Sequence, residues 1–205
     1  MPRPVRLTYF RHGETAWSLS GQHTGASEIP LTPHGEEQAR ALRPRVEATG
    51  FWRVLSSPRL RARETCRLAG ASADPEIEPD AAEWNYGDYE GLRTVEIRAE
   101  RPGWNIFRDG CPNGESPADI QARADRVIAR IRTLEGEVAL FSHGHFGLVF
   151  AARWIGLDVA QARHFKLDPA SASLLRFDSA EPDAADIALW NASTAAIGAH
   201  AARAP

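Results

Sequence analysis

Segments typical of strands and segments typical of helices alternate along most of this chain, and that alternation restricts the folds open to it. The run VRLTYF at 5–10 alternates in polarity and is rich in β-branched and aromatic residues, which predicts a first strand. Thr32, Pro33 and Glu36 match a helix start: a threonine N-cap, a proline at the first helical position and an early acid. Further strands are predicted at 51–55, 76–81, 137–141, 171–177 and 187–190, and helices at 33–49, 58–69, 117–134 and 146–155.

Alternating strands and helices form parallel sheets with helices packed on both faces. We therefore expect an α/β fold: a single domain with three α/β/α layers around a mostly parallel central sheet. The length of 205 residues suits one large domain, and neither an internal repeat nor a linker divides residues 1–205. Residues 84–115 are rich in glycine, proline and aromatic residues, and we expect an irregular excursion there that holds one short helix.

Charge and composition exclude several classes of protein. The formal net charge is −3 and the isoelectric point is about 6.2, so no global basic field indicates nucleic acid as a partner. No apolar run approaches the roughly 18 residues of a membrane span, so no membrane partner is expected. Cys66 and Cys111 have neither metal-ligand nor CxxC spacing. The chain enters its first strand without a charged-then-apolar leader, which predicts a cytoplasmic protein, and nothing in the sequence indicates an oligomeric state.

Polar residues follow several of the predicted strands at the point where each strand ends. They are Arg11-His12-Gly13 after the first strand, Arg61 beyond the second, Glu83 beyond the weak third and Ser142-His143-Gly144-His145 after the strand at 137–141. In open α/β sheets the ligand lies beyond the carboxyl ends of the strands. Two histidines, at least two arginines and a carboxylate are therefore predicted to converge on one edge of the sheet.

This set of side chains suits transfer of a phosphoryl group to a histidine. A neutral imidazole is a competent nucleophile near pH 7, because its unperturbed pKa is about 6.5. Arginine forks bind phosphate oxygens and keep their charge, and a second histidine can donate to the same oxygens. A carboxylic acid can protonate the leaving oxygen and, once ionised, activate water. Gly13 and Gly144 would let the backbone approach the ligand closely.

At these residues the chain resembles the phosphoglycerate mutase-like branch of the histidine phosphatase superfamily. The resemblance runs through RHGETAW, TGASEIPLTPHGEEQA, SSPRLRARETC, EWNYGDYEG and FSHGH and covers most of residues 7–150. It implies a phosphoglycerate mutase-like fold and no need for a metal, so no cofactor is expected. By matching position it also implies roles for ten residues: His12 as the phosphorylated nucleophile, Glu83 as general acid and base, Arg11, Arg61 and His143 as a phosphate clamp, and Ser18, Thr24, Gly25, Tyr86 and Gly144 near the substrate.

The function that the resemblance implies is that of a phosphomonoesterase, which hydrolyses a small phosphorylated metabolite, such as a sugar phosphate or bisphosphate, through a phosphohistidine. The first alternative is a phosphoglycerate-type mutase, which passes the same phosphoryl group to another hydroxyl. The resemblance implies that mutases carry a longer insertion before the FSHGH segment, an asparagine in place of Ser18 and a lysine in place of Thr94, so hydrolysis is favoured. The second alternative is a non-catalytic module that binds a phosphorylated ligand, and the presence of both nucleophile and acid argues against it.

Other interpretations of the same residues remain open. Glu83 could serve as a helix or turn cap. The spacing of His143 and His145 also occurs in zinc sites, but no HExxH or acidic companion exists, so no metal site is expected and His145 is expected to face the helix start. The remaining histidines are interpreted as surface or packing residues: His23, His34, His164 and His200.

Substrate specificity is predicted to reside in the excursion at 84–115, because loops at the carboxyl edge of such a sheet carry recognition. Its cations and apolar side chains would suit the distal part of a phosphorylated sugar or acid, although solvated arginines and a core tryptophan are an equally good interpretation. The residues concerned are Arg93, Arg98, Arg101, Arg108, Trp104 and Phe107.

Overall fold

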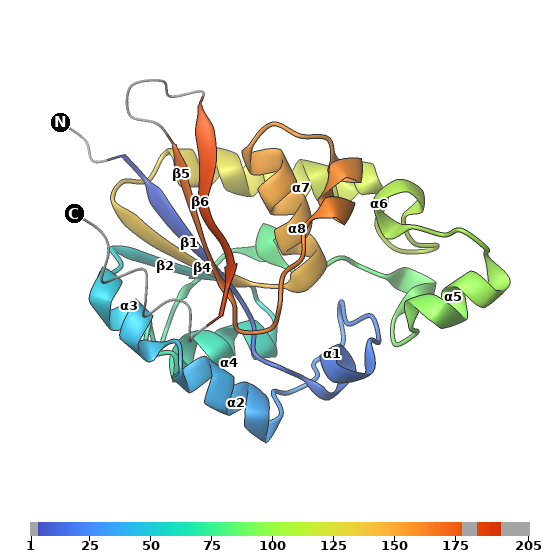
Figure 1. Ribbon diagram of the computed structural model, residues 1–205, viewed down its shortest axis with the longest axis horizontal. Coiled ribbons are helices and arrows are strands. Elements are labelled where there is room, and N and C mark those ends of the chain that lie inside the picture. The colour runs from blue at the N-terminus through green and yellow to red at the C-terminus, as the bar shows by residue number, and fades with distance from the viewer. Residues whose placement is uncertain (1–3, 178–183, 194–205) are drawn as a thin grey trace.

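The computed structural model describes residues 4–177 and 184–193, and its core is a six-stranded sheet (Figure 1). The strands lie in the order β3-β2-β4-β1-β5-β6. β1 pairs in parallel with β4, β4 with β2 and β2 with β3, whereas β5 runs antiparallel to both β1 and β6. The strands are β1 (Arg6–Arg11), β2 (Arg53–Ser56), β3 (Glu76–Ile77), β4 (Glu137–Ser142), β5 (Ala172–Phe177) and β6 (Ala185–Ala192).

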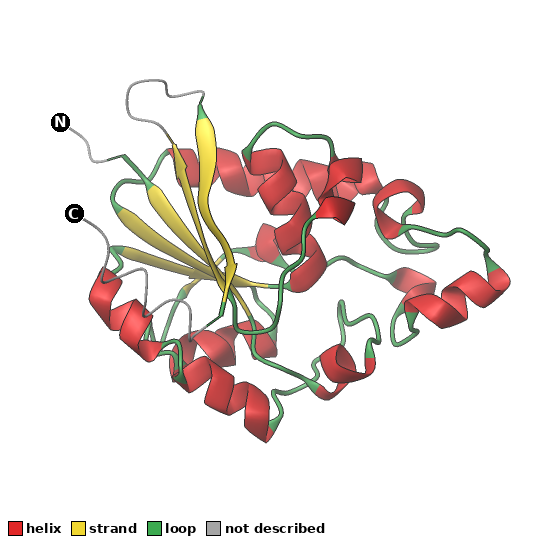
Figure 2. Ribbon diagram, in the orientation of Figure 1, coloured by secondary structure: helices red, strands yellow, loops and turns green. Residues whose placement is uncertain are grey.

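Helices cover both faces of this sheet (Figure 2). They are α1 (Ala16–Ser20), α2 (Pro33–Arg40), α3 (Arg43–Thr49), α4 (Leu60–Leu68), α5 (Thr94–Glu100), α6 (Ile106–Asp109), α7 (Pro117–Arg132) and α8 (Gly144–Trp154). Short 3₁₀ helices occur at Pro79–Ala81, Gly87–Tyr89 and Val159–His164. Within the residues described, no helix combines the length and the apolar character needed to cross a membrane.

Apolar side chains of β1 point alternately to the two faces of the sheet, and this explains the three layers. Leu7 and Tyr9 point to one face, where they are fully buried in the core that α7 and α8 complete. Phe10 points to the other face and packs with Val46 of α3 and Cys66 of α4. Successive side chains of a strand point to opposite faces of the sheet. A strand with apolar side chains on both faces therefore needs helices packed on both faces. The predicted single α/β domain with a mostly parallel sheet is thus confirmed.

Several predicted boundaries were wrong for local reasons. The single helix expected at 33–49 is two helices, since Pro44 has no N–H to donate back across the junction at Ala41 and Leu42. The weak strand expected at 76–81 is limited to Glu76–Ile77, because Pro79 begins a 3₁₀ turn.

The excursion expected to be irregular contains more helix than predicted. The 84–115 excursion holds two α-helices, α5 and α6, and the Asn105 side chain caps the second by accepting from the Phe107 amide at 3.0 Å. The helix α1 was not predicted either, and it starts with a capping box formed by Thr15 and Ser18.

Candidate active site

Parallel strands bring two histidines together at the carboxyl edge of the sheet. His12 follows β1 and His143 follows β4, and the two strands are direct neighbours. The His12 amide donates to the Ser142 carbonyl at 3.0 Å, and the Ser57 amide beyond β2 donates to the Phe141 carbonyl at 2.9 Å. The ring centroids of His12 and His143 consequently lie 5.3 Å apart. The predicted convergence of these strand ends is present in the structure.

His12 is buried in a defined tautomer. Its Nδ1 lies 2.7 Å from the Gly13 carbonyl oxygen, which can only accept, so Nδ1 carries the proton and Nε2 presents a lone pair. Burial, reinforced by the positive charges of Arg61 and Arg11, holds the pKa of His12 well below its usual value. His12 is therefore a neutral imidazole at pH 7, the form in which it can act as a nucleophile.

The turn after His12 is held by close backbone packing. The Gly13 amide donates to Thr65 Oγ1 of α4 at 3.0 Å. A Cβ on Gly13 would overlap the Gly35 carbonyl of α2, and a Cβ on Gly35 would overlap the Glu14 carbonyl. Only glycine at both positions permits this approach, so the first turn of α2 fixes the segment that carries His12.

Arg61 is completely buried on the first turn of α4 and binds the backbone of the loop before α2. Its terminal nitrogens donate to the carbonyls of Ser27 at 3.0 Å, Thr24 at 2.8 Å and Gly25 at 3.2 Å. Arg61 therefore fixes this loop and also supplies positive charge beside His12. Sequence reasoning assigned it only the second of these contributions.

Three buried nitrogens around His12 have no hydrogen-bond partner among the described residues. They are Nε of Arg11, Nε of Arg61 and Nδ1 of His143. A terminal nitrogen of Arg11 donates to the Leu167 carbonyl, which orients the guanidinium, but its Nε stays unpaired. Buried donors without a partner cost free energy, so a cluster of them indicates a site built for an acceptor.

His143 is held in place by the residue after β2. Its Nε2 lies 2.7 Å from Ser57 Oγ, which also accepts from the Arg59 amide at 3.2 Å and can donate its own proton to the ring. That arrangement leaves the proton of a neutral His143 on the unpaired Nδ1. Burial first, and then the charge of Arg61, lower its pKa well below the usual value.

Glu83 lies at the N-terminus of α8. One carboxylate oxygen accepts from the amides of Trp84 at 2.8 Å and Phe146 at 2.7 Å, and the other accepts from the His145 amide at 3.0 Å. The alternative interpretation of Glu83 as a cap is thus realised in the geometry, but the carboxylate also lines a cavity. The oxygen that accepts from the His145 amide alone keeps a second lone pair, so the three amides orient the carboxylate and leave one position on it for a proton.

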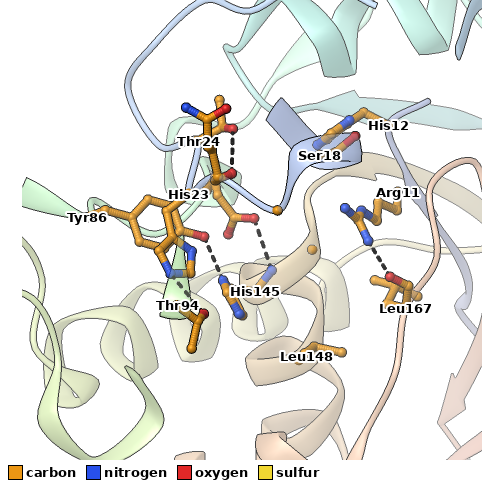
Figure 3. Close-up of a pocket in the computed structure, with 14 residues that line it drawn as sticks. Arg11, His12, Ser18, His23, Thr24, Tyr86, Thr94, His145, Leu148 and Leu167 are labelled. Atoms are coloured by element: carbon orange, nitrogen blue, oxygen red, sulfur yellow. Dashed lines mark hydrogen bonds between the residues drawn. The ribbon is translucent and has the colours of Figure 1, made fainter. Parts of the chain in front are cut away.

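The cavity has a volume of about 260 Å³ and opens beside His12 (Figure 3). Seven of the ten predicted site residues line it: Arg11, His12, Ser18, Thr24, Glu83, Tyr86 and Gly144. Arg61 and His143 do not line it, and both are fully buried. Gly25 does not line it either. Its amide lies 2.9 Å from both Glu90 oxygens, and a Cβ there would overlap the Trp84 carbonyl.

Sequence reasoning missed several residues that line the cavity, among them His23, Thr94 and His145. His23 stacks on Tyr86 with ring centroids 4.6 Å apart, and the Tyr86 hydroxyl lies 2.6 Å from His145 Nδ1. His23 was assigned to the surface or to packing, and His145 only to the helix start. The spacing of His143 and His145 was a usable signal, since both follow β4 directly at the ligand edge.

The arginines of the excursion do not reach this cavity. Arg93 pairs with Glu96 at 3.1 Å and Arg108 with Asp109 at 2.8 Å, all within their own segments. Trp104 belongs to the hydrophobic core and is 2% exposed. The hypothesis that the arginines contact the distal part of the substrate therefore has no support in the geometry. The excursion contributes Tyr86 and Thr94 instead.

The zinc interpretation of the HGH segment finds no supporting geometry in the ranges described. His143 Nε2 faces Ser57, and His145 Nδ1 faces Tyr86. No group of three or more His, Cys, Asp or Glu side chains in the described part of the chain is arranged to hold a metal ion.

Comparisons with known proteins agree with this geometry. The profile described as "Histidine phosphatase superfamily (branch 1)" matches residues 7–192. An acid phosphatase of Mycobacterium tuberculosis is 40% identical over 86% of this chain and 88% of its own length. A sedoheptulose 1,7-bisphosphatase of Saccharomyces cerevisiae is 41% identical over 75% of this chain and 69% of its own. A solved structure of an open reading frame product of M. tuberculosis superposes with a TM-score of 0.86 at 36% identity, covering 94% of this chain and 100% of that one.

Proposed function

Because the chain belongs to branch 1 of the histidine phosphatase superfamily and is a phosphoric monoester hydrolase, we propose that it hydrolyses a small phosphorylated metabolite through a phosphohistidine at His12. The observation that carries this proposal is the set of unpaired buried donors on the residues that neighbour His12: Arg11 Nε, Arg61 Nε and His143 Nδ1. Phosphate oxygens are the acceptors that arginine and histidine donors suit best.

In the first step, the Nε2 lone pair of His12 attacks phosphorus and the bond from phosphorus to the ester oxygen breaks. Arg11, Arg61 and His143 stabilise the charge on the equatorial oxygens. Protonated Glu83 gives its proton to the leaving oxygen, so the product leaves as a neutral alcohol.

In the second step, Glu83 acts as a carboxylate. It takes a proton from a water molecule as the water oxygen attacks phosphorus, and the bond between phosphorus and His12 Nε2 breaks. Orthophosphate leaves, and the neutral imidazole and protonated Glu83 are restored. Because Glu83 lies in the same cavity as His12, one group can serve both steps.

A small metabolite fits the dimensions of the site. The cavity of about 260 Å³ lies just below the range of roughly 300–1,000 Å³ that is common for small-molecule sites. The two relatives that are about 40% identical are named for acid phosphatase and sugar bisphosphatase activities, which supports a small phosphate ester as the substrate.

The proposal is tested by a screen of phosphorylated metabolites for phosphate release, with and without a bisphosphoglycerate donor. We expect release from at least one small ester that needs no donor and that is lost in a folded His12→Ala variant. A requirement for the donor, with transfer to a second hydroxyl in place of release, would establish the mutase alternative.

A further inference from the structure

Four side chains form a cluster on the side of the cavity away from His12, and we call it the distal cluster. Figure 3 shows His12 and Arg11 on one side, and the distal cluster reaching across to the other. The cluster consists of His23, Tyr86, Thr94 and His145, all of which line the cavity.

Contacts within the distal cluster hold its polar groups in fixed positions. The Tyr86 hydroxyl lies 2.6 Å from His145 Nδ1, and the rings of His23 and His145 lie 5.6 Å apart between centroids. Thr94 Oγ1 lies 3.4 Å from His23 Nε2. His23 also packs edge-on against Trp104 of the core, with centroids 5.7 Å apart. A site preorganised in this way recognises one arrangement of partners and rejects others.

The distal cluster carries no charge at neutral pH. Burial, reinforced by the neighbouring His145, lowers the pKa of His23 to about 4. Burial, reinforced by Arg11, lowers the pKa of His145 to about 4 as well. Among the described residues that line the cavity, Arg11 is the only arginine or lysine and Glu83 is the only acid.

This distribution of charge decides what the cavity can accept besides the reacting phosphate. Arg11 and Arg61, whose positive charges act on His12, would bind the reacting phosphate there. A second phosphate group on the substrate would reach the neutral imidazoles and the hydroxyls of the distal cluster, and would lose hydration without gaining a cationic partner. Hydroxyl groups, by contrast, can donate to and accept from each of these side chains.

We propose that the distal cluster is a specificity subsite for an uncharged, hydroxyl-bearing leaving group, so that this enzyme selects sugar monophosphates over sugar bisphosphates. The inference rests on the proposed function and names the substrate class of the same site. Leu148 and Leu167 also line the cavity and offer an apolar surface to the carbon skeleton. The preference would separate this chain from the yeast relative, whose name specifies a bisphosphate.

The test is a comparison of binding, which does not depend on turnover. Calorimetry on a His12→Ala variant measures the affinities for fructose 6-phosphate and fructose 1,6-bisphosphate, which share one carbon skeleton. We expect the monophosphate to bind at least about tenfold more tightly, since an unpaired ionic group costs more than that ratio represents. Equal affinities, tighter binding of the bisphosphate or binding of neither would overturn the inference.

A pair of lysine variants distinguishes the effect of a positive charge inside the distal cluster from the effect of the same charge outside it. Thr94→Lys, on the same His12→Ala background, places a cation in the distal cluster and should shift the ratio of affinities toward the bisphosphate by about tenfold. Val95→Lys adds the same charge one residue further along α5, where Val95 is 66% exposed and does not line the cavity, and should leave the ratio unchanged. Equal shifts in both variants would contradict the subsite.

Failure of the proposed function gives a different result. Wild-type enzyme is assayed in parallel with p-nitrophenyl phosphate, which has no second charged group. Absence of hydrolysis, with the calorimetric preference intact, would refute the reaction and keep the subsite. Hydrolysis without the preference would refute the subsite and keep the reaction.

Discussion

Lowering the pH from 7 to 5 should destabilise this protein, because its folded state keeps several histidines neutral that the unfolded chain would protonate. The pKa of His23 and that of His145 are each lowered to about 4, mainly by burial. In the unfolded chain both return to about 6.5. The folded pKa lies below the unfolded one, so stability is complete above about pH 6.5 and declines as the pH falls toward 4.

The size of the effect follows from linkage. Between pH 7 and pH 5 the unfolded state takes up about three quarters of a proton at each of these histidines and the folded state about a tenth of one, which costs roughly 2 kcal/mol per histidine. His12 and His143, whose pKa values are also lowered mainly by burial, act in the same direction. The sum is a large part of a typical stability of about 5–15 kcal/mol.

The variant His23→Phe isolates one contribution. Phenylalanine can keep the ring stack on Tyr86, which has a 4.6 Å centroid separation, but it cannot take up a proton. Urea unfolding at pH 7, 6 and 5, followed by tryptophan fluorescence, gives the free energy of unfolding at each pH. The loss between pH 7 and 5 should be about 2 kcal/mol smaller in His23→Phe than in the wild type.

A matched control is available on α2. His34→Phe removes a histidine whose side chain is 62% exposed, and we expect it to leave the loss between pH 7 and 5 unchanged. The same pH dependence in His23→Phe and the wild type would refute the assignment of a buried, neutral His23.

Three further predictions concern the chemistry and the turn that carries it. Glu83→Gln should slow hydrolysis of alkyl phosphates by roughly 10²–10⁴-fold and of aryl phosphates by less, because aryl alcohols leave with less proton assistance; equal losses in rapid-quench assays would give Glu83 another role. Gly35→Ala should lower the free energy of unfolding by roughly 1–3 kcal/mol, since its Cβ meets the Glu14 carbonyl, and urea titration measures this; an unchanged midpoint would contradict the packing. Activity should survive exhaustive EDTA treatment, whereas a loss that zinc restores would make His143 and His145 metal ligands.

The parts of the site that could be predicted from sequence are those that a strand places. His12 and His143 each follow an apolar strand directly, so the parallel pairing of β1 and β4 brings them together. The local charge pairs were also readable: Arg93 and Glu96 are three residues apart, a spacing at which helical side chains meet. Applied to the excursion, that spacing would have argued against Arg93 as a substrate contact.

The part that could not be predicted depends on pairing between distant loops. His23 reaches the cavity because its amide donates to the Leu92 carbonyl and its carbonyl accepts from the Gly91 amide, both at 2.9 Å. Two loops about 70 residues apart in sequence are joined here by backbone groups, which leave no periodic pattern in the side chains. The burial of Arg61 was hidden for a similar reason, since its partners are carbonyls of another loop.

The central claim is that His12 carries the phosphoryl group between the two steps. Rapid acid-free quenching during turnover of p-nitrophenyl phosphate, followed by intact-mass and peptide mass spectrometry, tests this most directly. The account predicts one added phosphoryl group on the peptide that contains His12, formed and lost at rates consistent with turnover and absent from a folded His12→Ala variant. Phosphorylation at another residue, or turnover that persists in folded His12→Ala, would contradict it.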